Sequence, residues 1–121
     1  LARDLARVGM MMANGGQRNG KQVVPSSWLE DIVKNGDPQA WKDGDFYNEM
    51  GQRDIHYRSK WYVKREAEPL IFGVGIHGQF LFVDPAKKLS ISWFASQDSP
   101  LDGPLFEKTL SIIEKIRGLV S

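Results

Sequence analysis

Residues 59–95 constrain the fold of this chain most, because they carry several strand-forming patterns in close succession. Aromatic and β-branched residues gather in four segments, at residues 59–64, 70–76, 79–83 and 89–95. The last two segments are joined by residues 84–88, Asp-Pro-Ala-Lys-Lys, which suit a hairpin connection. The stretch therefore predicts three or four antiparallel strands.

The last of these segments indicates how the sheet is buried. Leu89, Ile91 and Trp93 alternate with Ser90 and Ser92. Successive side chains of a strand point to opposite faces, so one face of this strand should meet a core.

Helical spacing precedes the strands. Leu1, Leu5, Val8 and Met12 recur at helical intervals, and residues 14–16, Asn-Gly-Gly, suit the end of a helix. A second helix is expected to begin near residues 25–27, Pro-Ser-Ser. Within it, Ser27 and Glu30 have the spacing of a capping box.

A long helix should close the chain from Pro104 onward. Its apolar stripe consists of Leu105, Ile112, Ile113, Ile116 and Leu119. The charged residues that we expect on its solvent side are Glu107, Lys108, Glu114, Lys115 and Arg117.

Together these patterns predict an α+β fold formed by a single domain over residues 1–121. It has an antiparallel β-sheet of three to four strands, with two N-terminal helices and a C-terminal helix packed on it. Between the second helix and the strands, residues 37–56 show no periodicity. A loop of that length in a compact domain is usually functional or mobile.

The composition excludes several classes of function. Sixteen basic residues against fifteen acidic ones leave a net charge of +1. That balance gives no electrostatic reason to expect nucleic acid or an anionic membrane as partner. No apolar run approaches the roughly 18 residues of a membrane span. The chain has no cysteine, which rules out disulfides, thiolate zinc sites and a cysteine nucleophile but leaves the compartment open.

The histidines give no metal site. His56 and His77 are the two histidines of the chain and lack a nearby carboxylate pattern, so we expect neither a metal nor a cofactor. His56 stands in a polar region and is interpreted as a solvated surface residue. His77 lies among Gly73, Gly75 and Gly78, where missing side chains let a ligand or another chain approach. Local pattern alone favours a bulge or bend slightly over a binding site.

The G-x-G-x-x-G match at residues 73–78 runs into a strand rather than a helix, so it does not predict a dinucleotide site. The chain also lacks a recognisable nucleophile. No serine is followed by lysine at the third position, and no G-x-S-x-G segment occurs.

The aromatic residues fall into two groups. Trp28, Trp93, Phe94 and Phe106 lie on predicted apolar faces and are expected in the core. For Trp61 and Tyr62, beside the irregular region, ligand contact and simple packing are equally favoured.

Four stretches, in their order and spacing, resemble a known family. They are residues 2–9 with the methionine-rich turn to Gly16, residues 24–29, residues 57–63, and residues 75–85 followed by 89–96. In this order they resemble the serine β-lactamase-related hydrolases, which include class C β-lactamases and D-alanyl-D-alanine carboxypeptidases. Gly-Ile-His-Gly-Gln at residues 75–79 is most similar to the 6-aminohexanoate-dimer hydrolase branch.

The resemblance implies a mechanism. In the family, a Ser-x-x-Lys serine aided by a tyrosine attacks an amide, ester or lactam carbonyl. Both would precede Leu1, so the chain would be a C-terminal fragment that holds no catalytic nucleophile and is inactive alone. His77 would take the basic position of the third motif, Gly78 would permit close approach, and Gln79 could offer an N–H to the oxyanion. The spacing from His77 to Asp84 is shorter than the family's pattern.

The resemblance also implies partners. A small-molecule amide, ester or lactam would be the substrate, and the missing N-terminal portion of the same protein would complete the sheet. We therefore expect an open sheet edge and uncovered apolar surface. The alternative is a non-catalytic module that grips a peptide or glycan with residues 37–56, Trp61 and Tyr62.

Overall fold

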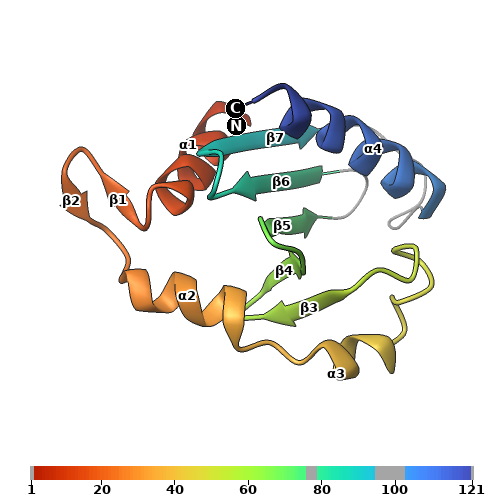
Figure 1. The fold of residues 1–121 in the computed structure, drawn as a ribbon. Helices are drawn as coiled ribbons and strands as arrows, with labels where there is room; N and C mark the ends of the chain where they lie inside the picture. Colours follow the sequence, from red (N-terminus) through yellow and green to blue (C-terminus); the bar gives the residue numbers. More distant parts are fainter. Residues whose placement is uncertain (1, 76–78, 95–102, 121) are drawn as a thin grey trace.

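The predicted α+β class is confirmed by a computed structural model, which describes residues 2–75, 79–94 and 103–120 (Figure 1). Its helices are α1 (Ala2–Ala13), α2 (Ser26–Lys34), α3 (Pro38–Lys42) and α4 (Gly103–Leu119). Its strands are β1 (Gln17–Arg18), β2 (Lys21–Gln22), β3 (Ile55–Arg58), β4 (Trp61–Lys64), β5 (Leu70–Gly75), β6 (Gln79–Asp84) and β7 (Leu89–Phe94).

The main sheet has five antiparallel strands in the order β3-β4-β5-β6-β7, one more than predicted. The extra strand is β3, which lay partly in the predicted loop. It pairs with β4 through a turn at Ser59 and Lys60, whose φ angles are 53° and 72°. Two-residue hairpin turns with positive φ usually carry Asn or Gly, and neither residue is present here. The sequence therefore gave no signal for this turn.

The predicted loop at residues 37–56 also contains the short helix α3. The Asp37 carboxylate caps this helix, accepting hydrogen bonds from the backbone N–H groups of Gln39 at 3.0 Å and Ala40 at 3.2 Å. Pro38 occupies the first turn, where its missing N–H has no partner to lose. The helix brings Trp41 into the core, where its side chain is 8% exposed.

Alternation along the strands divides the core into two layers. On one face, Phe72 and Phe82 pack with Phe106 of α4 and Trp41 of α3. On the opposite face, residues of β5 and β6 pack with α1 and α2: Ile71, Leu81, Val83, Met12 and Ile32. The sheet is thus covered by helices on both sides, as Figure 1 shows for α1 and α4.

Helix α1 is held against β7 by the serines that alternate with its apolar residues. The Ser90 hydroxyl donates to the carbonyl of Ala6 at 2.8 Å, and the Ser92 hydroxyl donates to the carbonyl of Ala2 at 2.7 Å. Gly9 permits this close approach, since a Cβ there would lie less than 3.0 Å from Ser90 Oγ. The second face of β7 is therefore occupied by a helix.

Two expectations about local structure are wrong. The predicted capping box is absent, because α2 begins at Ser26 and its N-cap is Pro25, which makes no side-chain cap hydrogen bond. This start places Ser27 inside the first turn. Phe94, expected in the core, is 52% exposed because it lies beyond the part of β7 that α1 covers.

Two charged or titratable side chains are buried where solvent was expected. His56 is 0% exposed, since it belongs to β3 and packs under α2. Arg117 is 6% exposed, because its guanidinium pairs with the buried carboxylate of Asp84 at 2.8 Å. Each has at least one partner in a distant segment, Ile32 for His56 and Asp84 for Arg117, which local polarity does not reveal.

Candidate functional site

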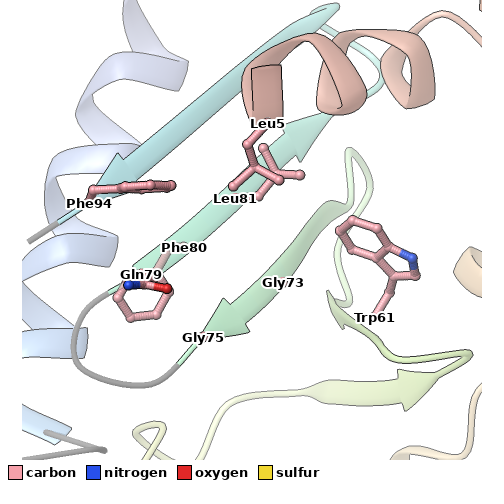
Figure 2. Close-up of a pocket in the computed structure, with 8 residues that line it drawn as sticks. All are labelled: Leu5, Trp61, Gly73, Gly75, Gln79, Phe80, Leu81 and Phe94. Carbon is pink, nitrogen blue, oxygen red and sulfur yellow. The ribbon is translucent and has the colours of Figure 1, made fainter. Parts of the chain in front are cut away.

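A partly open cavity of about 220 Å³ lies where α1 meets the strand ends of the sheet (Figure 2). The residues that line it come from α1 and from strands β4 to β7: Leu5, Trp61, Gly73, Gly75, Gln79, Phe80, Leu81 and Phe94. We call this cavity the glycine pocket. None of these described side chains is charged, so the part of the pocket that they form suits a neutral, largely apolar group.

The floor of the glycine pocket is backbone. Gly73 and Gly75 share the sheet face of Ile71, where α1 packs, because side chains alternate along β5. A Cβ at Gly73 would contact the Trp61 ring at 3.4 Å, and one at Gly75 would lie 3.1 Å from the Cβ of Gln79. Larger residues at these positions would occupy the space that now forms the pocket.

These glycines do not mark a bulge. The register of β5 and β6 is continuous through Gly73↔Leu81 and Gly75↔Gln79. Within the described part of both strands the expected bulge is therefore absent, and the two glycines leave that face of β5 open.

Gln79 is exposed and lies at the edge of the pocket, paired with Gly75. Residues 76–78 join these two paired positions along the chain. His77 and Gly78 lie outside the described residues, so their roles stay predictions. Of the predicted site residues, the structure brings Gln79 and Trp61 to one pocket.

Tyr62 lies on the opposite face of the sheet from Trp61. Its ring belongs to an aromatic row across the strands, with centroid distances of 4.7 Å to Tyr57 and 5.3 Å to Phe72. The Trp41 ring meets it edge-on at 5.6 Å. Burial, and secondarily Tyr57, raise the pKa of the Tyr62 phenol, which keeps it neutral. A single ligand on one face cannot contact both Trp61 and Tyr62.

Sequence reasoning missed several residues that line the pocket. Leu5 was assigned to a helix stripe and Phe94 to the core, and neither carries a local sign of a binding site. The available signal was the pair Gly73 and Gly75 within an apolar strand, which marks close approach of another group.

No group of three or more metal-ligating side chains occurs among residues 2–75, 79–94 and 103–120. The helices in that part of the chain are all too short or too polar to cross a membrane.

Comparison with known proteins finds two that resemble this chain over most of its length. No family model matches it. It is 35% identical over 99 residues to the 6-aminohexanoate-dimer hydrolase of Paenarthrobacter ureafaciens, a match that covers 82% of this chain and 25% of the relative. Most of the chain is thus similar to a part of a 6-aminohexanoate-dimer hydrolase.

A solved structure agrees with that relationship. It is a Bacillus anthracis protein provisionally named 6-aminohexanoate-dimer hydrolase, with a TM-score of 0.71 and 29% sequence identity. The superposition covers 98% of this chain and 29% of that protein. The predicted resemblance to the serine β-lactamase-related hydrolases, in their 6-aminohexanoate-dimer hydrolase branch, is confirmed. The chain spans about a quarter of the length of the curated relative.

Proposed function

We propose that this chain is the C-terminal part of a serine hydrolase that cleaves amide, ester or lactam bonds by acyl transfer. The observation that carries the proposal is the glycine pocket beside the Gly75↔Gln79 pair, on a chain related to 6-aminohexanoate-dimer hydrolases. A neutral pocket next to a strand end is suited to a small uncharged acyl group.

In this proposal, residues 77–79 border the reacting carbonyl. The His77 imidazole orients the substrate, Gly78 leaves room for it, and the backbone N–H of Gln79 donates to the oxyanion. Such a donor stabilises charge that develops in the transition state, and removing one donor typically lowers kcat by about 10²–10³-fold.

The nucleophile must come from elsewhere. Because no serine of the 121 residues is followed by lysine at the third position, the acylated serine and its tyrosine partner belong, in this proposal, to the rest of the parent protein. The chain alone is then inactive.

The structure offers a surface to which that remainder could bind. Strand β7 is an edge of the sheet and pairs with β6 alone among the described strands. Beside it, Leu105, Ile112 and Leu119 of α4 follow one another at seven-residue intervals and are 39%, 37% and 86% exposed. We call these three residues the α4 stripe.

The α4 stripe lies on the flank of the helix away from the β3 end of the sheet. Glu107, two residues after Leu105 and so about 200° round the helix, pairs with Arg53 just before β3. Glu114 stands in the same relation to Ile112 and pairs with Lys64 of β4 at 3.4 Å. We propose that the N-terminal portion adds a strand to β7 and covers the α4 stripe, which removes the open edge.

A comparison of the hydrolase activities of the isolated chain and the full-length parent tests the proposal. The 121-residue chain and the full-length parent are purified and assayed with the 6-aminohexanoate dimer and a chromogenic ester. We expect turnover by the parent alone, abolished when its Ser-x-x-Lys serine is replaced by alanine. Turnover by the isolated chain, or an inactive parent, would contradict the proposal.

A further inference from the structure

We propose that Asn19 is a site of spontaneous deamidation, where the side-chain amide becomes a carboxylate without the help of an enzyme. The chain contains three Asn-Gly pairs, at residues 14–15, 19–20 and 35–36. Glycine after asparagine favours this reaction, because its missing Cβ lets the backbone nitrogen approach the preceding side chain. The surroundings of the three pairs differ, and they select the pair in the β1–β2 hairpin.

The reaction needs no reagent other than water. The backbone nitrogen of Gly20 attacks Cγ of Asn19, and the bond from Cγ to the side-chain nitrogen breaks. The proton of the Gly20 N–H passes through water to the leaving nitrogen, which departs as ammonia. Water then opens the resulting cyclic imide at either of its carbonyl groups, which gives aspartate or isoaspartate. In isoaspartate the main chain runs through the former side chain.

The hairpin leaves both reacting groups without a competing contact. Arg18 pairs with Lys21, so Asn19 and Gly20 form the turn between the strands, with φ angles of 52° and 77°. Among the described residues, the Gly20 N–H has no hydrogen-bond acceptor and the Asn19 side chain has no partner. Asn19 is exposed, and a Cβ at Gly20 would have no neighbouring atom within 4 Å.

The hairpin can also open at little cost. Asn19 must rotate before its amide meets the Gly20 nitrogen, so the rate depends on how often the turn opens. Strands β1 and β2 have two residues each, are exposed and project from the body of the molecule (Figure 1). A two-stranded hairpin is marginally stable by itself, and exposed elements open with a small free-energy cost.

At residues 14–15 the attacking nitrogen is occupied. The N–H of Gly15 donates to the carbonyl of Met12 at 3.1 Å, at the C-terminal end of α1. The next residue, Gly16, is buried, and its N–H donates to the carbonyl of Met11 at 2.9 Å. The end of α1 must therefore unwind before the nitrogen of Gly15 can attack.

At residues 35–36 the asparagine and the glycine are both held. The Asn35 side chain donates to the Asp31 carboxylate at 2.8 Å. Gly36 lies against buried His56, so closely that a Cβ on Gly36 would be less than 3.0 Å from the His56 side chain. Deamidation here requires a movement that disturbs the packing between α2 and the sheet, which costs far more than opening an exposed turn.

Peptide mapping by mass spectrometry tests the proposal on the 121-residue chain, kept at mildly alkaline pH. In the folded chain, Asn19 should react at least about tenfold faster than Asn14 or Asn35, because packed segments open much less often than exposed ones. In concentrated guanidinium chloride the three rates should agree to within about threefold, since the protection given by the fold is lost. The product should contain isoaspartate as well as aspartate.

Two variants locate the reaction independently. Each deamidation replaces a neutral amide by a carboxylate, so ion-exchange chromatography separates the product as a more acidic form. Asn19→Ser should remove most of this form. Asn14→Ser is the matched control, because it makes the same change at another exposed asparagine and should leave the rate unchanged.

Four results would overturn the inference. They are equal rates at the three pairs in the folded chain, a faster reaction at Asn14 or Asn35, a product that is aspartate alone, and a folded chain intact at Asn19 after the denatured chain has reacted. None of these measurements depends on hydrolase activity, so the outcome leaves the proposed function untouched.

Discussion

His56 is fixed between α2 and the sheet by two hydrogen bonds that define its protonation state. Its Nδ1 lies 2.7 Å from the Arg65 guanidinium, which can only donate, so Nδ1 accepts. Nε2 therefore carries the proton and donates to the carbonyl of Ile32 at 2.6 Å. That carbonyl belongs to the last turn of α2, where helical partners are missing. A neutral His56 ties the helix end to β3.

This arrangement predicts a pH-dependent stability. Burial lowers the pKa of His56 from its ordinary 6.5, reinforced by Arg65 and Arg58 and opposed by the Ile32 carbonyl and Asp54. Between the folded pKa and 6.5 the unfolded chain binds more protons, so stability rises with pH in that window and is lost as pH falls through it. The slope contributed by one group is at most about 1.4 kcal/mol per pH unit.

Urea unfolding between pH 4.5 and 7.5 measures this effect. We expect His56→Gln to flatten the dependence near neutral pH, although the variant is less stable overall. Lys108→Gln, at an exposed position of α4, serves as the control and should keep the slope. A slope that survives in His56→Gln would contradict the assignment.

Gly36 supplies the space that His56 occupies. A Cβ at this position would lie less than 3.0 Å from three side-chain atoms of His56, two of them in the imidazole ring. Gly36→Ala should therefore destabilise the chain by roughly 1–3 kcal/mol, the usual cost of overpacking. Gly118→Ala is the comparison, since its Cβ meets open space and should stabilise helix α4 by roughly 0.5–1 kcal/mol. Thermal unfolding measures the stability of both variants. Equal unfolding midpoints for Gly36→Ala and Gly118→Ala would refute the steric role of Gly36.

At the scale of elements, α4 is anchored by Arg117 at its C-terminal end. The guanidinium donates to Asp84 at 2.8 Å, to Glu66 at 2.7 Å and to the carbonyl of Glu68 at 2.6 Å. These partners belong to β6 and to the connection between β4 and β5. One side chain thus fixes the helix to two parts of the sheet.

Removal of that anchor should be costly. Arg117→Met leaves the carboxylate of Asp84, 1% exposed, without its ion-pair partner. We expect a loss of roughly 3–5 kcal/mol in the free energy of unfolding, as for other broken buried pairs. Lys115→Met, on the exposed side of α4, should change it by less than about 0.5 kcal/mol. Similar effects of the two substitutions in denaturant titrations would show that the network does not stabilise the fold.

Elements with their own periodicity could be predicted from the sequence, and elements defined by distant partners could not. The alternation in β7 predicted that strand, and the apolar spacing in α1 and α4 predicted that these helices exist. The predicted apolar stripes were partly wrong, because Val8 of α1 and Leu105, Ile112 and Leu119 of α4 are exposed. Strand β3 was not predicted from the sequence, because Ser59 and Lys60 form the turn after it without Asn or Gly. The solvent face assigned to Arg117 was wrong because two of its acceptors, Asp84 and Glu66, lie 33 and 51 residues away along the chain.

At the scale of the whole molecule, the glycine pocket needs residues from one helix and four strands. Trp61 was a candidate for ligand contact because of its aromatic character, and Gln79 because of the resemblance to hydrolases. Their meeting in one cavity depends on the register of β4, β5 and β6, which no local pattern specifies. The separation of Trp61 from Tyr62 does follow from strand alternation once both belong to β4.

The open edge and the α4 stripe also predict how the isolated chain behaves in solution. An edge strand beside exposed Leu105, Ile112 and Leu119 offers both hydrogen-bonding groups and apolar area to a second copy. We expect the 121-residue chain to self-associate as its concentration rises, measured by sedimentation velocity.

Ile112→Lys with Leu119→Lys should restore a monomer, because two charges would have to be buried at the contact. Ser111→Lys with Gly118→Lys adds the same charge at exposed positions about 100° round the helix and should leave the association unchanged. A chain that stays monomeric at every concentration would show that the β7 edge and the α4 stripe do not drive association in water. The proposed docking of the N-terminal portion would then lose its main support.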